Sequence, residues 1–301
     1  MFLKIQAIVH VYKLFNYYLF IYMNTKITRT VVSFGAMVSL LASPVLAMPG
    51  NGNSDGSHGH ALPKDAVKIT DELYDLGDKV DVDGNTVHGY AFVHHAKGYN
   101  SHKPQHNGGG DVLASSCYAF ISKGARWKNT ESYVVDPTNN ALLDEATIQS
   151  LIATGLDTWD TEVSFDVFGA QAATGTVDAA SVGNISNNVN EVMFADIAQT
   201  NVIAVTYVWG IFWGKPFQKK LTEWDMVFDD TDFVWSAENL GVEGAMDFQN
   251  IAVHEIGHAA GMGHPGDSCT EESMYRFASA GEIKKRDLHS GDVAGIMALY
   301  K

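Results

Sequence analysis

Residues 254–264 read HEIGHAAGMGH, which places three histidines and one glutamate at the spacing HExxHxxGxxH. His254 and His258 are four residues apart, so on an α-helix both imidazoles lie on the same face. Gly261 can adopt a left-handed conformation, which ends the helix and turns the chain. The turn brings His264 back to the other two histidines. The stretch therefore predicts a site where three imidazoles bind one metal ion.

The ligand set of this site is typical of catalytic zinc. Imidazole nitrogens bind Zn²⁺, and three protein ligands leave the fourth position open, unlike a closed structural site. Glu255 lies beside the first ligand, where it can act on a water molecule without binding the ion. A bare HExxH also occurs on ordinary helices with surface or core histidines. The addition of Gly261 and His264 makes such a coincidence improbable.

The motif lies on a predicted helix from about Asp247 to Ala260. Asp247 is a good N-cap residue because its carboxylate can accept a hydrogen bond from the first turn. The positions after it carry apolar side chains at helical spacing, namely Phe248, Ile251, Ala252, Ile256 and Ala259. The sequence context therefore supplies the helix that the metal site needs.

With these residues in place, the chain resembles the metzincin metallopeptidases and, among them, the matrixin-like branch. The zinc motif matches residue by residue, Ser273-Met274-Tyr275 resembles the Met-turn, and residues 288–300 resemble the closing helix. The resemblance covers approximately residues 117–301. It implies an α/β (α+β) domain with a mixed, mostly parallel twisted sheet, a zinc-binding helix, a Met-turn and a C-terminal helix. It also implies that Met274 forms the apolar floor beneath the zinc.

The chain departs from the matrixin pattern after the metal site. Pro265 follows the third ligand, where many matrixins have a small polar residue. Arg276-Phe277 stands where the family has Pro-x-Tyr, so the shape of the main specificity pocket differs. Phe277 cannot bind a metal, and no tyrosine ligand is predicted. Nothing matches the second-zinc and calcium loop of vertebrate matrixins, and calcium at Asp229-Asp230-Thr231-Asp232 has no defined motif to support it.

Upstream of the motif, the sequence predicts alternating strands and one helix. The predicted strands are Cys117–Ile121, Ser132–Val135, Val163–Phe168, Glu191–Ile197, Val202–Trp209 and Glu223–Phe228. Residues 144–160 have helical apolar spacing. The Gly-, Asn- and Ser-rich residues 169–190 predict a long surface loop, as do residues 233–244, and residues 290–300 predict the final helix.

By the resemblance, one strand is the exposed sheet edge that pairs with an extended peptide substrate. Its residues are Val202, Ile203, Ala204, Val205, Thr206 and Tyr207. The aromatic residues that follow have two interpretations of equal weight. They either contact a substrate or another surface, or cover the core. These residues are Trp209, Phe212, Trp213 and Phe217.

The N-terminal residues predict export. Residues 23–47 combine a short basic start with an apolar run and end in Val45-Leu46-Ala47, which suits cleavage by signal peptidase after Ala47. Residues 1–22 are interpreted as a start assigned too far upstream, with a membrane anchor as the competing interpretation. No apolar run after Leu46 is long enough to cross a bilayer. The mature protein is therefore predicted to be secreted, without stable membrane association.

Residues 48–111 predict a pro-segment or a small leading region, followed by the catalytic domain at 112–301. The leading region contains Asp-Gly-Asn at 83–85, which suggests a hairpin turn, and ends in a Gly-rich stretch at 107–110. Residues 63–111 of this region contain five histidines, which are interpreted as solvent-exposed rather than as a loose metal cluster. They are His88, His94, His95, His102 and His106.

Cys117 and Cys269 are the only two cysteines. In an exported protein, an even pair suggests one disulfide. The alternative is that Cys117 binds the zinc and keeps the enzyme latent, as in vertebrate matrixins. The residues around Cys117 do not match the Pro-Arg-Cys-Gly segment of that family, so the disulfide is preferred.

The net charge of −15, from 35 acidic and 20 basic side chains, argues against nucleic-acid binding. The sequence thus predicts a secreted, monomeric zinc endopeptidase with one catalytic Zn²⁺, with Glu255 as general base and proteins or peptides as substrates. A non-catalytic secreted zinc-binding protein that retains the fold is the alternative. A metal scavenger using the leading histidines is a further rival, and an amidase acting on cell-wall peptides has no supporting feature.

Overall fold

The structure is a computed structural model that describes residues 59–98 and 117–301. The predicted upstream extension at 1–22, the signal peptide at 23–47, and His102 and His106 of the leading region lie outside the described residues.

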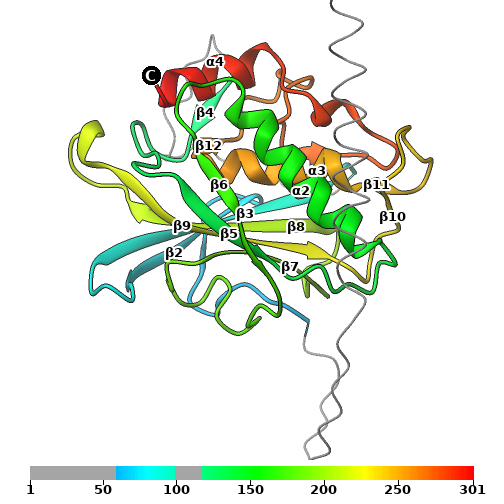
Figure 1. The fold of residues 1–301 in the computed structure, drawn as a ribbon, viewed down its shortest axis with the longest axis horizontal. Coiled ribbons are helices and arrows are strands. Elements are labelled where there is room, and N and C mark those ends of the chain that lie inside the picture. Colours follow the sequence, from blue (N-terminus) through cyan, green and yellow to red (C-terminus); the bar gives the residue numbers. More distant parts are fainter. Residues whose placement is uncertain (1–58, 99–116) are drawn as a thin grey trace, which may run out of the picture. The chain divides into compact units, whose positions relative to one another are not determined.

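One large twisted sheet dominates the described chain (Figure 1). Its strands lie in the order β1-β2-β3-β8-β9-β7-β5-β6, and β13 also pairs with β3. The strands are β1 (Val67–Lys68), β2 (Leu73–Val80), β3 (Thr86–Ala96), β5 (Glu131–Val135), β6 (Phe168–Thr174), β7 (Asn190–Ala195), β8 (Val202–Ile211), β9 (Lys220–Asp229) and β13 (Phe277–Ala278). Two small sheets pair β10 (Trp235–Ser236) with β11 (Met246–Asp247), and β12 (Met262–Gly263) with β4 (Ala119–Phe120).

The sheet is mixed, as predicted, but its longest pairings are antiparallel rather than parallel. The strands from β9 through β7 and β5 to β6 pair in parallel. Those from β1 through β2, β3 and β8 to β9 pair antiparallel. The difference arises because the leading region adds three strands to the sheet. β2 and β3 are joined by the predicted turn, where Gly84 has φ 82°, and strands joined by so short a turn must be antiparallel.

Within residues 59–98 and 117–301, three α-helices accompany the sheet: α2 (Glu145–Asp160), α3 (Phe248–Ala259) and α4 (Ser290–Leu299). In Figure 1, α2 and α3 lie on the same face of the sheet. Both begin at an aspartate whose carboxylate accepts a hydrogen bond from the first turn, Asp144 from the Thr147 amide and Asp247 from the Asn250 amide. Short 3₁₀ turns occupy Pro216–Gln218 and Lys284–Arg286.

Apolar side chains pack on both faces of the sheet. The larger cluster lies between the sheet and the helices and includes Trp159 of α2, Trp224 of β9 and Phe248 of α3. A second cluster includes Trp209 of β8 and Val87 of β3. Because each of the central strands contributes to both clusters, the sheet is buried on both sides and holds α3 in a fixed position.

Most predicted elements occur near their expected positions, but the region between α2 and β7 differs. Residues 163–168 were expected to form a strand, whereas the strand here is β6, which begins at the last of these residues and continues into the stretch expected to be a long loop. The carboxylate of Asp160 accepts hydrogen bonds from the amides of Val167 and Phe168, which folds the intervening residues against the end of α2. β6 pairs only with β5 and is rich in Ala and Gly, so it lacks the apolar alternation by which a strand is recognised.

Candidate metal centre

The helix α3 presents His254, Glu255 and His258 inside the protein, and all three side chains are buried. The helix ends at Ala260, and Gly261 follows with φ 102°. A β-carbon there would be strained and would lie 3.0 Å from the carbonyl oxygen of Ala125. The short pairing of β12 with β4 then fixes the returning chain on which His264 is carried.

The three histidines converge as a zinc site requires. The Nε2 atom of His264 lies 3.2 Å from that of His254 and 3.0 Å from that of His258. Tetrahedral ligands at a Zn–N distance of about 2.0–2.1 Å would be separated by about 3.4 Å, close to these values. The three residues therefore fit the ion in both donor type and arrangement.

Hydrogen bonds on the far sides of two rings orient the ligands. The Nδ1 atom of His254 lies 2.6 Å from the Ser273 carbonyl oxygen, and that of His258 lies 2.9 Å from the Met262 carbonyl oxygen. A carbonyl can only accept, so both Nδ1 atoms donate, and their Nε2 lone pairs are left for a metal. Burial lowers the pKa of His258 to about 4 and that of His254 well below its ordinary value, which favours the neutral form that binds metals.

Glu255 is fully buried beside the ligands, and both of its carboxylate oxygens have partners. Oε2 accepts a hydrogen bond of 2.6 Å from the Thr206 hydroxyl of β8, and Oε1 lies 2.9 Å from the Nδ1 atom of His94 of β3. Burial raises the pKa of Glu255 to about 7. These contacts were not predicted from the sequence, which placed Thr206 on a substrate-pairing strand and His94 in the solvent.

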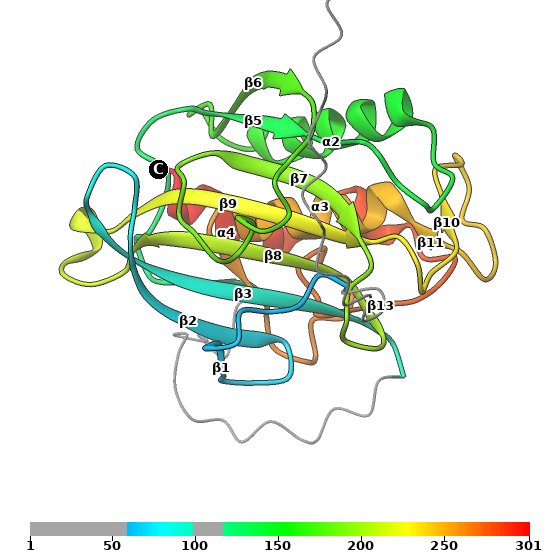
Figure 2. The ribbon, with the colours of Figure 1, turned by 90° about the horizontal axis from the view of Figure 1, so that it is seen from below.

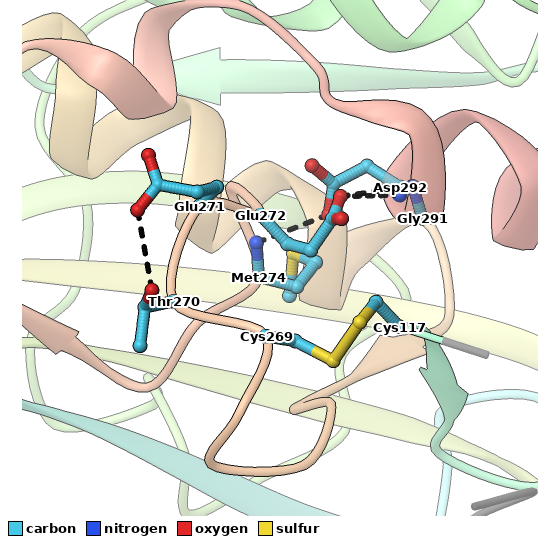
Figure 3. Close-up of a disulfide and its surroundings, with 8 residues drawn as sticks. All are labelled: Cys117, Cys269, Thr270, Glu271, Glu272, Met274, Gly291 and Asp292. Atoms are coloured by element: carbon cyan, nitrogen blue, oxygen red, sulfur yellow. Dashed lines mark hydrogen bonds between the residues drawn. A yellow bond between two sulfur atoms is a disulfide. The ribbon is translucent and has the colours of Figure 1, made fainter. Parts of the chain in front are cut away.

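The Met-turn lies beneath this site, and Met274 is fully buried. Asp292 of α4 accepts hydrogen bonds from the amides of Ser273 and Met274 (Figure 3). Lys285, which sequence analysis missed, is also fully buried and donates to the carbonyl oxygens of Ser273 and Tyr275. Because the Ser273 carbonyl also accepts from His254, the turn supports the first metal ligand.

Gly257 lets the helix approach the Met-turn closely. A β-carbon at this position would overlap the sulfur of Met274 and lie 2.6 Å from Cζ2 of Trp159. We expect Gly257→Ala to lower the free energy of unfolding by about 1–3 kcal/mol because the core is overpacked. Urea denaturation would measure it, with Gly266→Ala as control because its β-carbon would meet no atom within 4 Å. Equal stability of the two variants would contradict this packing.

A disulfide joins Cys117, just before β4, to Cys269 in the loop ahead of the Met-turn (Figure 3). In this arrangement the sulfur of Cys117 is not available to bind a metal. Close by, the carboxylate of Glu272 accepts hydrogen bonds from the amides of Gly291 and Asp292 at the start of α4. The loop is therefore fixed both covalently and through α4.

Removing this cross-link should destabilise the protein. The bridge spans 152 positions of the sequence, so it restricts the unfolded chain strongly. We expect the double variant Cys117→Ser, Cys269→Ser to lose about 2–5 kcal/mol of unfolding free energy. Chemical denaturation of both proteins without reductant would measure the loss. If reductant lowers the unfolding free energy of the parent to that of the variant, the loss is due to the disulfide. Equal stability of parent and variant without reductant would contradict the prediction.

The predicted substrate strand is not at a sheet edge. β8 pairs with β9 on one side and with β3 on the other, along most of its length. Residues 202–207 are all buried. The expected edge is absent because the leading region, predicted to be a pro-segment or a small leading region, supplies the neighbouring strand β3 (Figure 2).

The remaining candidate residues separate into different environments. Trp209 belongs to the second apolar cluster and Phe212 packs against the larger one, whereas Trp213 and Phe217 are 49% and 74% exposed. The two interpretations of this aromatic group thus apply to different members. His88 is paired with Asp75 and Asp78 on β2. His94 and His95 are buried, so the prediction that the leading histidines are solvent-exposed is wrong for these two.

The described residues also include the calcium candidate Asp229 and the helices that could be tested for membrane spans. The carboxylate of Asp229 accepts hydrogen bonds from the amides of Ile197, Thr231 and Asp232, so backbone donors use the oxygens that had been considered for calcium. None of the helices in this part of the chain has the length and apolar character needed to cross a membrane.

The mixed sheet, the helix with two histidines, the returning third histidine and the turn at Met274 together resemble a metallopeptidase domain, and the three histidines could hold a metal ion. The matrixin family model matches residues 126–301, more than half of the chain. The chain therefore belongs to the matrixin family, peptidase M10.

Curated relatives from Arabidopsis thaliana match shorter stretches. Metalloendoproteinase 2-MMP is 46% identical over 61 residues, which cover 20% of this chain and 15% of that protein. Metalloendoproteinase 5-MMP is 35% identical over 82 residues, which cover 25% of this chain and 22% of that protein. The chain thus spans less than a quarter of the length of either relative.

Proposed function

We propose that this protein is a secreted zinc endopeptidase. The observation that carries the proposal is the convergence of three imidazoles beside a buried glutamate. The Nε2 atom of His264 lies 3.2 Å from that of His254 and 3.0 Å from that of His258. Membership of the matrixin family supports the same activity. The substrates would be proteins or peptides, as the peptidase family implies. The acidic chain argues against nucleic acids as ligands.

His254, His258 and His264 would hold the zinc ion. When bound, zinc supplies a Lewis acid that lowers the pKa of water and polarises the scissile carbonyl. Glu255 takes a proton from the attacking water and delivers it to the leaving amine. The hydroxyl of Thr206 holds Oε2 of Glu255 and so orients the carboxylate for this transfer.

Export rests on the sequence and on the disulfide. Residues 23–47 have the composition of a signal peptide, and disulfides persist mainly in oxidising compartments. In this proposal the catalytic domain begins near residue 112, the mature protein is a monomer, and residues 48–111 include the segment that is removed on activation. The non-catalytic alternative is disfavoured because Glu255 is retained and its carboxylate is held in place by Thr206.

The test uses the chain from Met48, with a recognition sequence for a specific protease placed within residues 105–111. Bound zinc is counted by elemental analysis, and casein is incubated with the protein before and after the chain is cut. One zinc per chain and new internal cleavages in casein are expected after the cut. Stoichiometric zinc with no hydrolysis of casein or of a peptide library would support the non-catalytic alternative instead.

A further inference from the structure

Strand β3 passes directly over the metal ligands. Its side chains alternate between the two faces of the sheet, and Phe92 and His94 point towards α3. The ring of Phe92 stacks on His258 with centroids 4.1 Å apart, and the ring of His94 lies 4.0 Å from that of His254. The same His94 contacts the carboxylate of Glu255. One strand of the leading region therefore touches two of the predicted ligands and the predicted base.

The same strand is held on both edges around the metal site. Along one edge, β3 pairs antiparallel with β8, with Phe92 opposite Thr206 and His94 opposite Ala204. Along the other edge its partner changes from β2 to β13, which follows the Met-turn and pairs with β3 in parallel at His95 and Ala96. β3 thus lies between the strand beside the metal helix and the segment beyond the Met-turn (Figure 2).

Most of this attachment is made by the backbone. Beyond the paired register of β8, the amide of Ala96 donates to the Asn201 carbonyl at 3.0 Å, and that of Lys97 donates to the Ala278 carbonyl at 2.7 Å. An ion pair of 3.2 Å between Glu72, ahead of β2, and Arg276, ahead of β13, adds a second anchor. Backbone pairing to an open strand is also the general means by which proteins bind extended peptides with little sequence demand.

We propose that β3 is an inhibitory strand, which occupies the position where an extended peptide substrate would pair with β8. This inference rests on the proposed peptidase function. With β3 in place, Glu255 is 0% and His258 is 1% exposed, so neither water nor a peptide reaches the predicted base. When residues 59–98 leave, β8 becomes a sheet edge beside the metal, and the hydroxyl of Thr206 still orients Glu255.

His94 distinguishes this strand from a substrate. Its imidazole occupies Oε1 of Glu255, the oxygen that Thr206 leaves free. A base engaged in this way has no oxygen directed at a water molecule. The strand therefore covers the site and leaves no oxygen of Glu255 free to accept a proton from water. The inhibition comes from backbone pairing combined with a histidine that blocks the base, and it needs no cysteine.

The experiment uses the chain from Met48 carrying the specific cleavage sequence within residues 105–111. Activity on a fluorogenic peptide and amide hydrogen exchange of β8 are measured for the uncut chain, for the cut chain, and for the cut chain over a dilution series. A synthetic peptide of residues 86–96 is then added back. The inhibitory strand predicts an uncut chain at least about tenfold less active than the diluted cut chain, faster exchange of the β8 amides on dilution, and reversal of both changes by the peptide.

A matched pair of peptides tests the part played by His94. The peptide with His94→Ala should inhibit about 10- to 100-fold more weakly, because a hydrogen bond to a buried charged group is lost. The peptide with His88→Ala is the control. His88 interacts with Asp75 and Asp78 of β2, which the peptide lacks, so its inhibition should be unchanged. Equal inhibition by all three peptides would overturn the role given to His94.

The remaining outcomes distinguish a failure of the inhibitory strand from a failure of the proposed peptidase function. An uncut chain as active as the cut chain would overturn the inhibitory strand and leave the peptidase standing. A cut chain that loses its near-UV circular dichroism on dilution, or whose β8 amides stay protected at every dilution, would show that β3 is a permanent part of the domain. Release of β8 and rebinding of the peptide, with no hydrolysis in any form, would support the strand and count against the peptidase.

Discussion

Glu255→Gln is expected to lower kcat/KM of the cut chain for protein substrates by about 10²- to 10⁴-fold while the zinc content stays at one per chain. Glutamine has nearly the same volume and keeps an amide oxygen that can accept the hydrogen bond from Thr206. It cannot take a proton from water at neutral pH, so only the proton transfer is removed. A loss of activity that came from misfolding would also lower the zinc content.

This prediction is measured by hydrolysis of casein and of a fluorogenic peptide, with elemental analysis of the same preparations. Glu271→Gln is the matched control, because its carboxylate is 73% exposed and contacts only the ammonium of Lys284 among charged groups. That variant should hydrolyse both substrates at the parent rate. If Glu255→Gln retained more than about a tenth of parent activity, Glu255 would not be the general base.

His258→Ala is expected to lower both zinc affinity and activity. One of three protein ligands is removed, and since zinc binding of about 10–16 kcal/mol is shared among four ligands, affinity should fall by at least about 10²-fold. The Met262 carbonyl also loses its donor, so the turn that carries His264 is weakened. At limiting zinc, hydrolysis should fall to the level of the zinc-free protein.

Competition with a chromogenic chelator measures the affinity, and hydrolysis is recorded as zinc is titrated back. His289→Ala serves as the control, since this partly exposed histidine lies before α4 and contacts the Lys284 carbonyl rather than the metal site. Unchanged zinc affinity in His258→Ala would mean that the ion is held elsewhere, and the proposed centre would have to be abandoned.

The convergence of the three histidines was predictable because its geometry is local. The four-residue spacing of two histidines on a helix, and a glycine that lets the chain turn back, bring three side chains together within eleven positions. The N-cap of α3 and the apolar spacing of α2 were predictable for the same reason, because capping and helical periodicity depend on residues that are close in the sequence.

The position of β3 over the site could not be predicted from neighbouring residues. β3 and β8 are separated by more than one hundred positions, and the residue pattern of neither strand predicts that the two pair. The family resemblance pointed to a free edge at β8, and the leading histidines carried no recognisable spacing. The burial of Lys285 was hidden too, because a lysine flanked by charged residues usually lies in solvent.

The position of the disulfide has a consequence for maturation. Cys117 is the first disulfide-bonded residue after the stretch between residues 99 and 116, and its partner lies in the loop ahead of the Met-turn. If the chain is activated by a cut within that stretch, as proposed above, the bond would keep Cys117 joined to Cys269 wherever the cut falls. Under that proposal the position of the cut would not need to be exact, because products with N-termini of different lengths would keep the same cross-link next to the proposed site.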